Sequence, residues 1–201
     1  MAMLKSLIAA ILLLSPQVLA GLREAPIPGY DVVDLTWEVE VLPGRVENLT
    51  GTVEQVHDAA RAINPDWRLP SSPAEPEDLA KRSGMYAWST AFCGPGTRGW
   101  RPCKARRVQE GINHLRSQLG HPRNGPGPRS CGRVSCSWQA SIWWCNDAPW
   151  ATVINSWNDI ADSAQLILWK CATGSGAADR YVAGQVFTIR KWNVIVRQDE
   201  C

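Results

Sequence analysis

The chain has 201 residues, seven cysteines and a formal net charge of +2. This length is enough for one domain with additional segments. After the first 20 residues, no stretch approaches the roughly 20 consecutive apolar residues that a transmembrane anchor needs, which excludes an anchored membrane protein.

The first 20 residues have the pattern of a secretory signal peptide. Lys5 supplies a short basic region, residues 7–14 form an apolar run, and small residues precede a cleavage site after Ala20. We therefore expect residues 1–20 to be removed and the protein to be secreted and extracellular.

Charge and cysteine are distributed unevenly over the remaining chain. Residues 21–82 contain no cysteine and carry 12 acidic against 6 basic residues, whereas residues 83–201 carry 14 basic against 7 acidic residues. The linker between them is rich in proline and ends in the dibasic pair Lys81-Arg82, a processing site for a secretory-pathway protease. We predict an acidic pro-segment over 21–82 that binds the mature domain, 83–201, before cleavage. The alternative is a small N-terminal subdomain that stays attached.

Two elements are predicted within the acidic segment. Residues 36–42 alternate as a strand does, and Thr52-Val-Glu-Gln55 has the form of a capping box that opens a helix. Between them, Asn48-Leu-Thr50 is an N-glycosylation acceptor that we expect in a loop.

The cysteine-rich part predicts a helix, a hairpin, a second helix and a second hairpin. The helices are expected at about 106–119 and from Ser156 through Cys171, and the first hairpin at 133–138 and 141–146 with Gln139-Ala140 in its turn. The runs 181–189 and 192–197 form the second hairpin. This order predicts an α+β fold, an antiparallel β-sheet with two helices packed on one face, stapled by disulfides.

Seven cysteines allow at most three intramolecular disulfides. Cys103 is expected to be the free thiol, because it lies in the least regular region. The predicted register makes Cys136 and Cys145 diagonal neighbours, too far apart to bridge. We expect one of them to reach Cys171, and Cys201 to tie the last strand back. The six cysteines assigned to disulfides are Cys93, Cys131, Cys136, Cys145, Cys171 and Cys201.

The sequence contains little that indicates catalysis. Glu110 and His114 stand four residues apart on the first of these helices and could act with an arginine as a ribonuclease-like acid and base, although a solvated helix face accounts for them more simply. The cysteine spacings lack the paired forms of structural zinc sites, so neither a metal nor a cofactor is expected.

Nine tryptophans follow residue 83 in the basic part of the chain. Exposed indoles beside basic residues suit an anionic lipid or a wall glycan, and no nucleic acid is expected. Trp143 is predicted in the core. Trp144, Trp150 and Trp157 are the candidates for a surface that binds a cell-surface target.

Residues 109–201 contain five distinctive motifs. They are Asn124-Gly-Pro-Gly-Pro128, Cys131-Gly-Arg-Val-Ser-Cys136, Ile142-Trp-Trp-Cys-Asn-Asp147, Asn158-Asp-Ile-Ala-Asp162 and Trp192-Asn-Val-Ile-Val196. These motifs resemble those of a group of small secreted cysteine-rich proteins of filamentous fungi. The arrangement is also loosely similar to fungal killer toxins and necrosis-inducing effectors, which are α/β sandwiches.

The resemblance implies a toxin- or effector-like role and supplies no catalytic residues, and Cys103 departs from the six-cysteine pattern. Our leading hypothesis is a non-enzymatic secreted effector that acts on a host or competitor cell; a ribonuclease and a wall-glycan-binding module are the alternatives.

Overall fold

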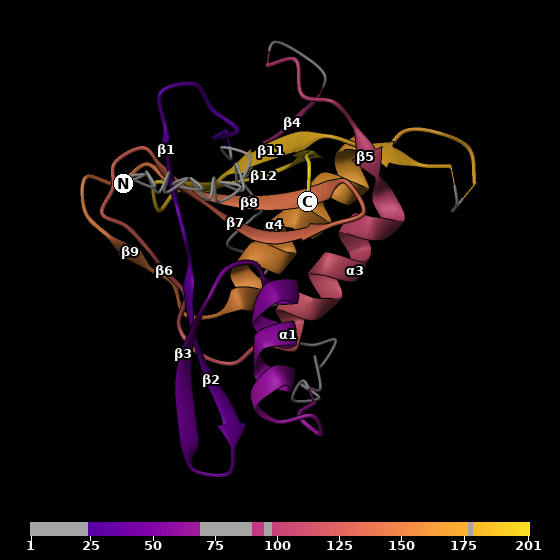
Figure 1. Ribbon diagram of the computed structural model, residues 1–201. Coiled ribbons are helices and arrows are strands. Elements are labelled where there is room, and N and C mark those ends of the chain that lie inside the picture. The colour runs from indigo at the N-terminus through magenta and orange to yellow at the C-terminus, as the bar shows by residue number, and fades with distance from the viewer. Residues whose placement is uncertain (1–23, 69–89, 95–97, 177–178) are drawn as a thin grey trace, which may run out of the picture.

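The computed structural model describes residues 24–68, 90–94, 98–176 and 179–201 (Figure 1). The expected signal peptide and the dibasic pair Lys81-Arg82 lie outside these residues. Removal of the signal peptide and cleavage after Arg82 therefore stay predictions.

The centre of the fold is a six-stranded sheet with the order β1-β7-β8-β12-β11-β4. Neighbouring strands are antiparallel except β1, which runs parallel to β7. The inner strands β8 and β12 are rich in β-branched and aromatic residues, which favour a pleated and buried surface. The strands are β1 (Asp31–Val33), β4 (Ala91–Cys93), β7 (Ser130–Ser137), β8 (Ala140–Asn146), β11 (Gly184–Phe187) and β12 (Trp192–Gln198).

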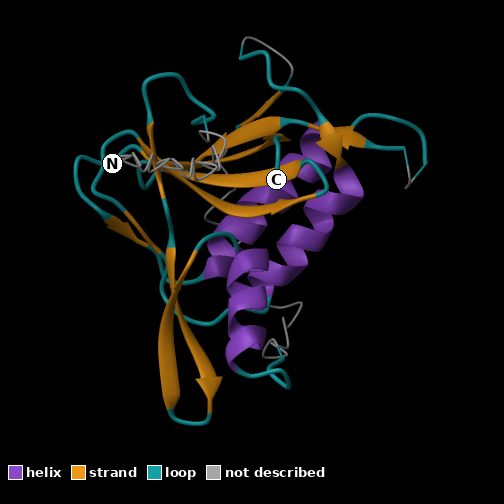
Figure 2. Ribbon diagram, viewed as in Figure 1, coloured by secondary structure: helices purple, strands orange, loops and turns teal. Residues whose placement is uncertain are grey.

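Helices cover one face of this sheet (Figures 1 and 2). They are α1 (Val53–Ile63), α3 (Ala105–Arg116) and α4 (Trp157–Cys171). Their apolar side chains share one core with the sheet, in which Ile112 of α3 and Ile160 of α4 are fully buried. The predicted mixture of helices with an antiparallel sheet is confirmed. The predicted number of two helices is only approximate, because α1 of the acidic segment joins the same layer.

The remaining strands form three short antiparallel pairs. β2 (Thr36–Leu42) pairs with β3 (Arg45–Thr50) in a hairpin that extends away from the central sheet (Figure 1). β5 (Cys103–Lys104) pairs with β10 (Tyr181–Val182), and β6 (Arg123–Asn124) pairs with β9 (Thr152–Val153). Asn48 lies within β3 and not in a loop as predicted, although its side chain is exposed.

The acidic segment is built into the core of the cysteine-rich part. The ring of Trp37 in β2 stacks on that of Trp157 at the start of α4, with centroids 3.5 Å apart and planes 7° from parallel. Each of these two tryptophans is only 2% exposed. Leu35 packs against Gly132, where a Cβ atom would lie 2.5 Å from the leucine Cγ. Residues on both sides of the expected cleavage site therefore share one core.

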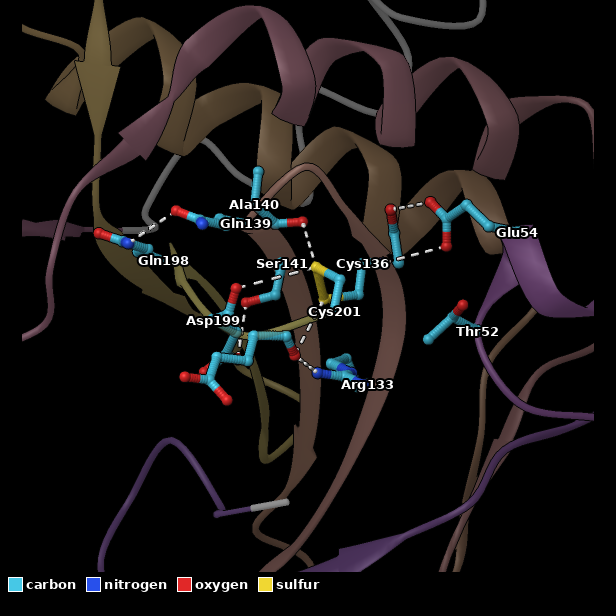
Figure 3. The surroundings of a disulfide bond; sticks show 12 residues. Thr52, Glu54, Arg133, Cys136, Gln139, Ala140, Ser141, Gln198, Asp199 and Cys201 are labelled. Atoms are coloured by element: carbon cyan, nitrogen blue, oxygen red, sulfur yellow. Dashed lines mark hydrogen bonds between the residues drawn. A yellow bond between two sulfur atoms is a disulfide. The ribbon is translucent and has the colours of Figure 1, made fainter. Parts of the chain in front are cut away.

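A carboxylate of α1 strengthens this junction. The side chain of Glu54 accepts hydrogen bonds from Ser135 Oγ at 2.5 Å and from the backbone N–H of Cys136 at 3.0 Å (Figure 3). Hydrogen bonds to an ionised acceptor are about twice as strong as those between neutral groups. Glu54 thus fixes the start of α1 against the middle of β7.

The second face of the sheet is also covered. A smaller apolar cluster forms there around Trp143 and Ile195, and Ile27 and Trp100 close it from outside. The indole N–H of Trp100 donates to the carbonyl of Pro26 at 2.8 Å, which joins the two covering segments. Because both faces are covered, aromatic side chains on either side of β8 are buried.

The hairpin of β7 and β8 differs in register from the predicted one. Arg133 pairs with Trp143, but the next pair joins Ser135 to Ile142, so an extra residue is inserted at Val134. Such a β-bulge reverses the alternation of side chains beyond it. Val134 accordingly lies in the helix-facing core, whereas Trp143 lies in the cluster on the opposite face.

The turn of this hairpin is also displaced by one residue. Trp138 and Gln139 occupy it with positive φ angles of 51° and 62°, and Ala140 already belongs to β8. Two positive φ angles match the twist of a two-residue hairpin, a requirement that overrides the poor turn preference of these residues.

Replacement of Trp37 by alanine is expected to lower the free energy of unfolding by about 3–5 kcal/mol, the usual cost of truncating a buried tryptophan. Denaturant titration of the secreted protein measures this change. The matched control is Trp169→Ala, at a side chain that is 68% exposed, which should cost no more than about 0.5 kcal/mol. Equal effects of the two substitutions would contradict the stacking of Trp37 in the core.

Cleavage after Arg82 is expected to leave the two pieces associated. Residues 21–82 contain no cysteine, so only non-covalent contacts hold them after a cut. After digestion with a dibasic-specific protease, the fragment should co-elute with the larger piece in native buffer and separate in denaturant without reductant. Its release in native buffer would show that the Trp37 and Glu54 contacts are not sufficient.

Candidate functional site

Three disulfides hold the sheet to its surroundings. They join Cys93 to Cys171, Cys131 to Cys145, and Cys136 to Cys201. The six cysteines predicted to form disulfides do so, and Cys103 is free. The tie from the C-terminus to the sheet is likewise confirmed.

The predicted partner of Cys171 is wrong. β4 carries Cys93 to α4, whereas Cys145 bonds Cys131 directly across the β7–β8 ladder, with Cα atoms 4.0 Å apart. The prediction failed because β7 begins at Ser130, three residues earlier than expected, which places Cys131 opposite Cys145.

A cleft of about 730 Å³ lies beside the Cys136–Cys201 disulfide. Three segments far apart in sequence form most of its wall, residues 24–28, 98–101 and 197–201, and Arg133 and Trp143 of the sheet add to it. Figure 3 shows Arg133 and Asp199 beside the disulfide that Cys201 forms with Cys136. The last five residues of the chain therefore line this cleft.

Polar contacts order the C-terminal side of this cleft. Asp199 accepts hydrogen bonds from Trp143 Nε1 at 2.6 Å and from Ser141 Oγ at 2.8 Å, and it forms an ion pair with Arg197 at 2.8 Å. Arg133 Nη1 donates to the carbonyl of Glu200 at 2.7 Å. These arginines and Asp199 hold the chain end in place, so their first role is structural.

The structure does not bring the candidate catalytic pair together. Glu110 accepts two hydrogen bonds from Arg107 Nη1, at 3.1 and 2.8 Å, and in the described part of the chain it makes none with His114. Both Glu110 and His114 are exposed on α3. The pair has the geometry of a solvated helix face and lacks the convergent groups that acid–base catalysis needs.

Two of the three tryptophans predicted at the surface are buried. Trp144 is 0% and Trp157 2% exposed, because the helix layer covers the former and Trp37 covers the latter. Trp150 is 62% exposed, and Lys191 Nζ lies 5.9 Å from the centroid of its ring. Only Trp150 therefore remains as a surface candidate from the original set.

One more exposed tryptophan is absent from the predicted surface set. Trp138 is 72% exposed in the β7–β8 turn, and Arg107 Cζ lies 4.7 Å from its ring centroid. The predicted strand 133–138 includes Trp138, whereas the observed turn begins one residue earlier and contains it. Trp138 and Trp150 thus each present an indole to solvent beside a basic side chain, an arrangement that supports cation–π contact.

The free thiol of Cys103 is not positioned for chemistry. Its side chain is 3% exposed and its Sγ donates to the carbonyl of Val182 at 3.4 Å. Burial raises the pKa of this thiol from its ordinary 9.0 to about 12, so the reactive thiolate is disfavoured.

Within the ranges that the structure describes, no group of three or more His, Cys, Asp or Glu side chains is placed to hold a metal ion. None of the described helices has both the length and the apolar character needed to cross a membrane.

Comparison of the chain with protein-family models, with curated proteins and with solved structures found no match. The function of the chain is therefore inferred from its own geometry and sequence motifs.

Alkylation of Cys103 is expected to require unfolding. At pH 9.0 an exposed thiol is about half ionised, whereas the raised pKa keeps the folded thiol protonated until the pH nears 12. Iodoacetamide at pH 9.0 should modify one cysteine per chain in denaturant and react much more slowly with the native protein, as mass spectrometry can measure. Cys103→Ala should remove the labelling in denaturant. Equally fast labelling of native and denatured protein would contradict the burial of this thiol.

Proposed function

We propose that the chain is a secreted, effector- or toxin-like protein that acts at the surface of a host or competitor cell by binding, without catalysis. The observation that carries this proposal is the exposure of Trp138 and Trp150, each beside a basic side chain, at the turns and loops of an otherwise well-covered sheet.

The disulfides and the signal-peptide pattern support the secreted location in this proposal. Three disulfides are typical of proteins that fold in an oxidising environment, and the signal-peptide pattern of residues 1–20 agrees with secretion. The surplus of basic residues after position 83 favours attraction to the anionic surfaces of cells.

The exposed indoles contribute little to the stability of the fold and are available for contact with a partner. A tryptophan that is 72% exposed contributes little to the core, and Trp138 also occupies a positive φ, which costs a bulky residue about 1 kcal/mol or more. Tryptophan and arginine are enriched among the residues that dominate binding energy at interfaces. Trp138 with Arg107 therefore fits a contact residue better than a structural one.

The test is binding of the labelled secreted protein to intact plant and fungal cells, followed by a cell-viability assay. Combined replacement of Trp138 and Trp150 by alanine should lower binding by about tenfold or more, as expected for interface anchors, at an unchanged thermal midpoint. Trp169→Ala, at an equally exposed tryptophan on α4, is the matched control and should bind as the original protein does.

Two outcomes would overturn the proposal: no binding of the unaltered protein to either cell type, or equal binding of the double variant. Retention on insoluble chitin or glucan without cell binding would favour the wall-glycan-binding alternative instead.

A further inference from the structure

Apolar side chains are exposed where β4 and β11 meet at one edge of the central sheet. The rings of Phe92 and Phe187 lie edge to face with centroids 5.8 Å apart. They are 56% and 38% exposed on the sheet face opposite the helices. These two rings form an exposed aromatic pair at this edge.

The turn between β11 and β12, which follows Phe187 in the chain, exposes another apolar side chain. Ile189 is 80% exposed in the turn, and Arg190 and Lys191 follow it at the surface. Lys191 reaches Trp150, which is 62% exposed in the loop after β8. We define the apolar edge as Phe92, Trp150, Phe187 and Ile189 together with the cations Arg190 and Lys191.

Buried hydrogen bonds hold the loop that carries Trp150. Asn146 Nδ2 donates to the carbonyl of Trp150 at 2.8 Å, and Asn146 Oδ1 accepts from the N–H of Ala148 at 2.9 Å and from Thr152 Oγ1 at 2.8 Å. The N–H of Asp147 donates to the carbonyl of Lys191 at 2.9 Å, which ties this loop to the β11–β12 turn. The apolar edge is therefore preorganised.

The charged side chains of the apolar edge itself are both cations. The segments that build it, residues 90–94, 148–153 and 184–194, contain Arg190 and Lys191 and no acidic residue. The neighbouring carboxylate of Asp147 accepts hydrogen bonds from the hydroxyl of Tyr30 at 2.6 Å and from Asn193 Nδ2 at 2.8 Å. A rim of aromatic and aliphatic side chains with adjacent cations is the composition of surfaces that insert into the interface of an anionic membrane.

We propose that the apolar edge docks on the surface of a bilayer that contains anionic lipids. Phe92, Ile189 and Trp150 enter the headgroup region, and Arg190 and Lys191 contact lipid phosphates and carboxylates. A glycan fits this surface less well because sugar recognition needs many polar side chains. The amides of Gln185 and Asn193 on this face are buried and hydrogen-bonded to each other at 3.0 Å.

This inference rests on the proposed function and names its target as lipid. The experiment is co-sedimentation of the full secreted protein with vesicles of pure phosphatidylcholine and with vesicles that also contain phosphatidylserine. Binding is expected only to the anionic vesicles and should weaken as salt is raised, since the basic contacts are screened.

Substitutions at the apolar edge test which residues contact the vesicle. Ile189→Asp, and Arg190→Gln combined with Lys191→Gln, should each lower vesicle binding by about tenfold or more, because the first removes apolar insertion and the second removes two cations. Lys170→Gln and Trp169→Ala on α4 are the matched controls and should bind like the unaltered protein. Thermal melts confirm that each variant is folded.

Several results would overturn the lipid assignment: no sedimentation with anionic vesicles, equal binding to neutral vesicles, or unchanged binding of the folded edge variants. Cell binding that depends on Trp138 and Trp150 without vesicle binding would leave the proposed function standing and reject lipid as its target. Retention of the protein on a polysaccharide in place of vesicles would identify a glycan partner and reject the lipid surface.

Discussion

The stacking of Trp37 on Trp157 is the contact on which the rest of the molecule depends. It joins a strand of the acidic segment to the first residue of α4, with both indoles nearly excluded from water. Glu54 adds hydrogen bonds to β7, and β1 extends the sheet in parallel with the same strand. The helix layer is complete only with these parts in place, since α1 packs beside α3 over the core that α3 and α4 also cover.

Because the two parts share a core, cleavage after Arg82 would not by itself release the acidic segment. Separation of the two pieces would expose Trp37, Trp157 and the apolar side of α1 to water, and the hydrophobic effect opposes such exposure in proportion to its area. The acidic balance of residues 21–82 and the basic balance of residues 83–201 favour the same association. Cleavage, where it occurs, would therefore nick a folded molecule, and loss of the acidic segment would require a further force such as binding or unfolding.

Coverage of both sheet faces also determines where binding can occur. With helices on one side and the residues around Ile27 and Trp100 on the other, the inner strands present little to solvent. Turns and edges remain, and there the chain exposes Trp138, Trp150 and Ile189, with basic neighbours beside each. The three disulfides and the contacts of Asp199 keep these turns and edges in fixed positions. The aromatic groups at the margins of this scaffold are the basis of the proposed binding function.

Local patterns were sufficient for the described helices and for the longest strands. Alternation predicted β2 with its observed bounds, and the Thr52 capping box predicted α1. These features depend on residues close together in the chain, so the sequence carries them directly. The disulfide partner of Cys145, the burial of Trp144 and the exposure of Trp138 could not be read in this way. They depend on a single inserted residue at Val134, on the true start of β7 and on which distant segments cover each face. Register and burial are properties of pairs of segments far apart in sequence, and they are settled when those segments pack.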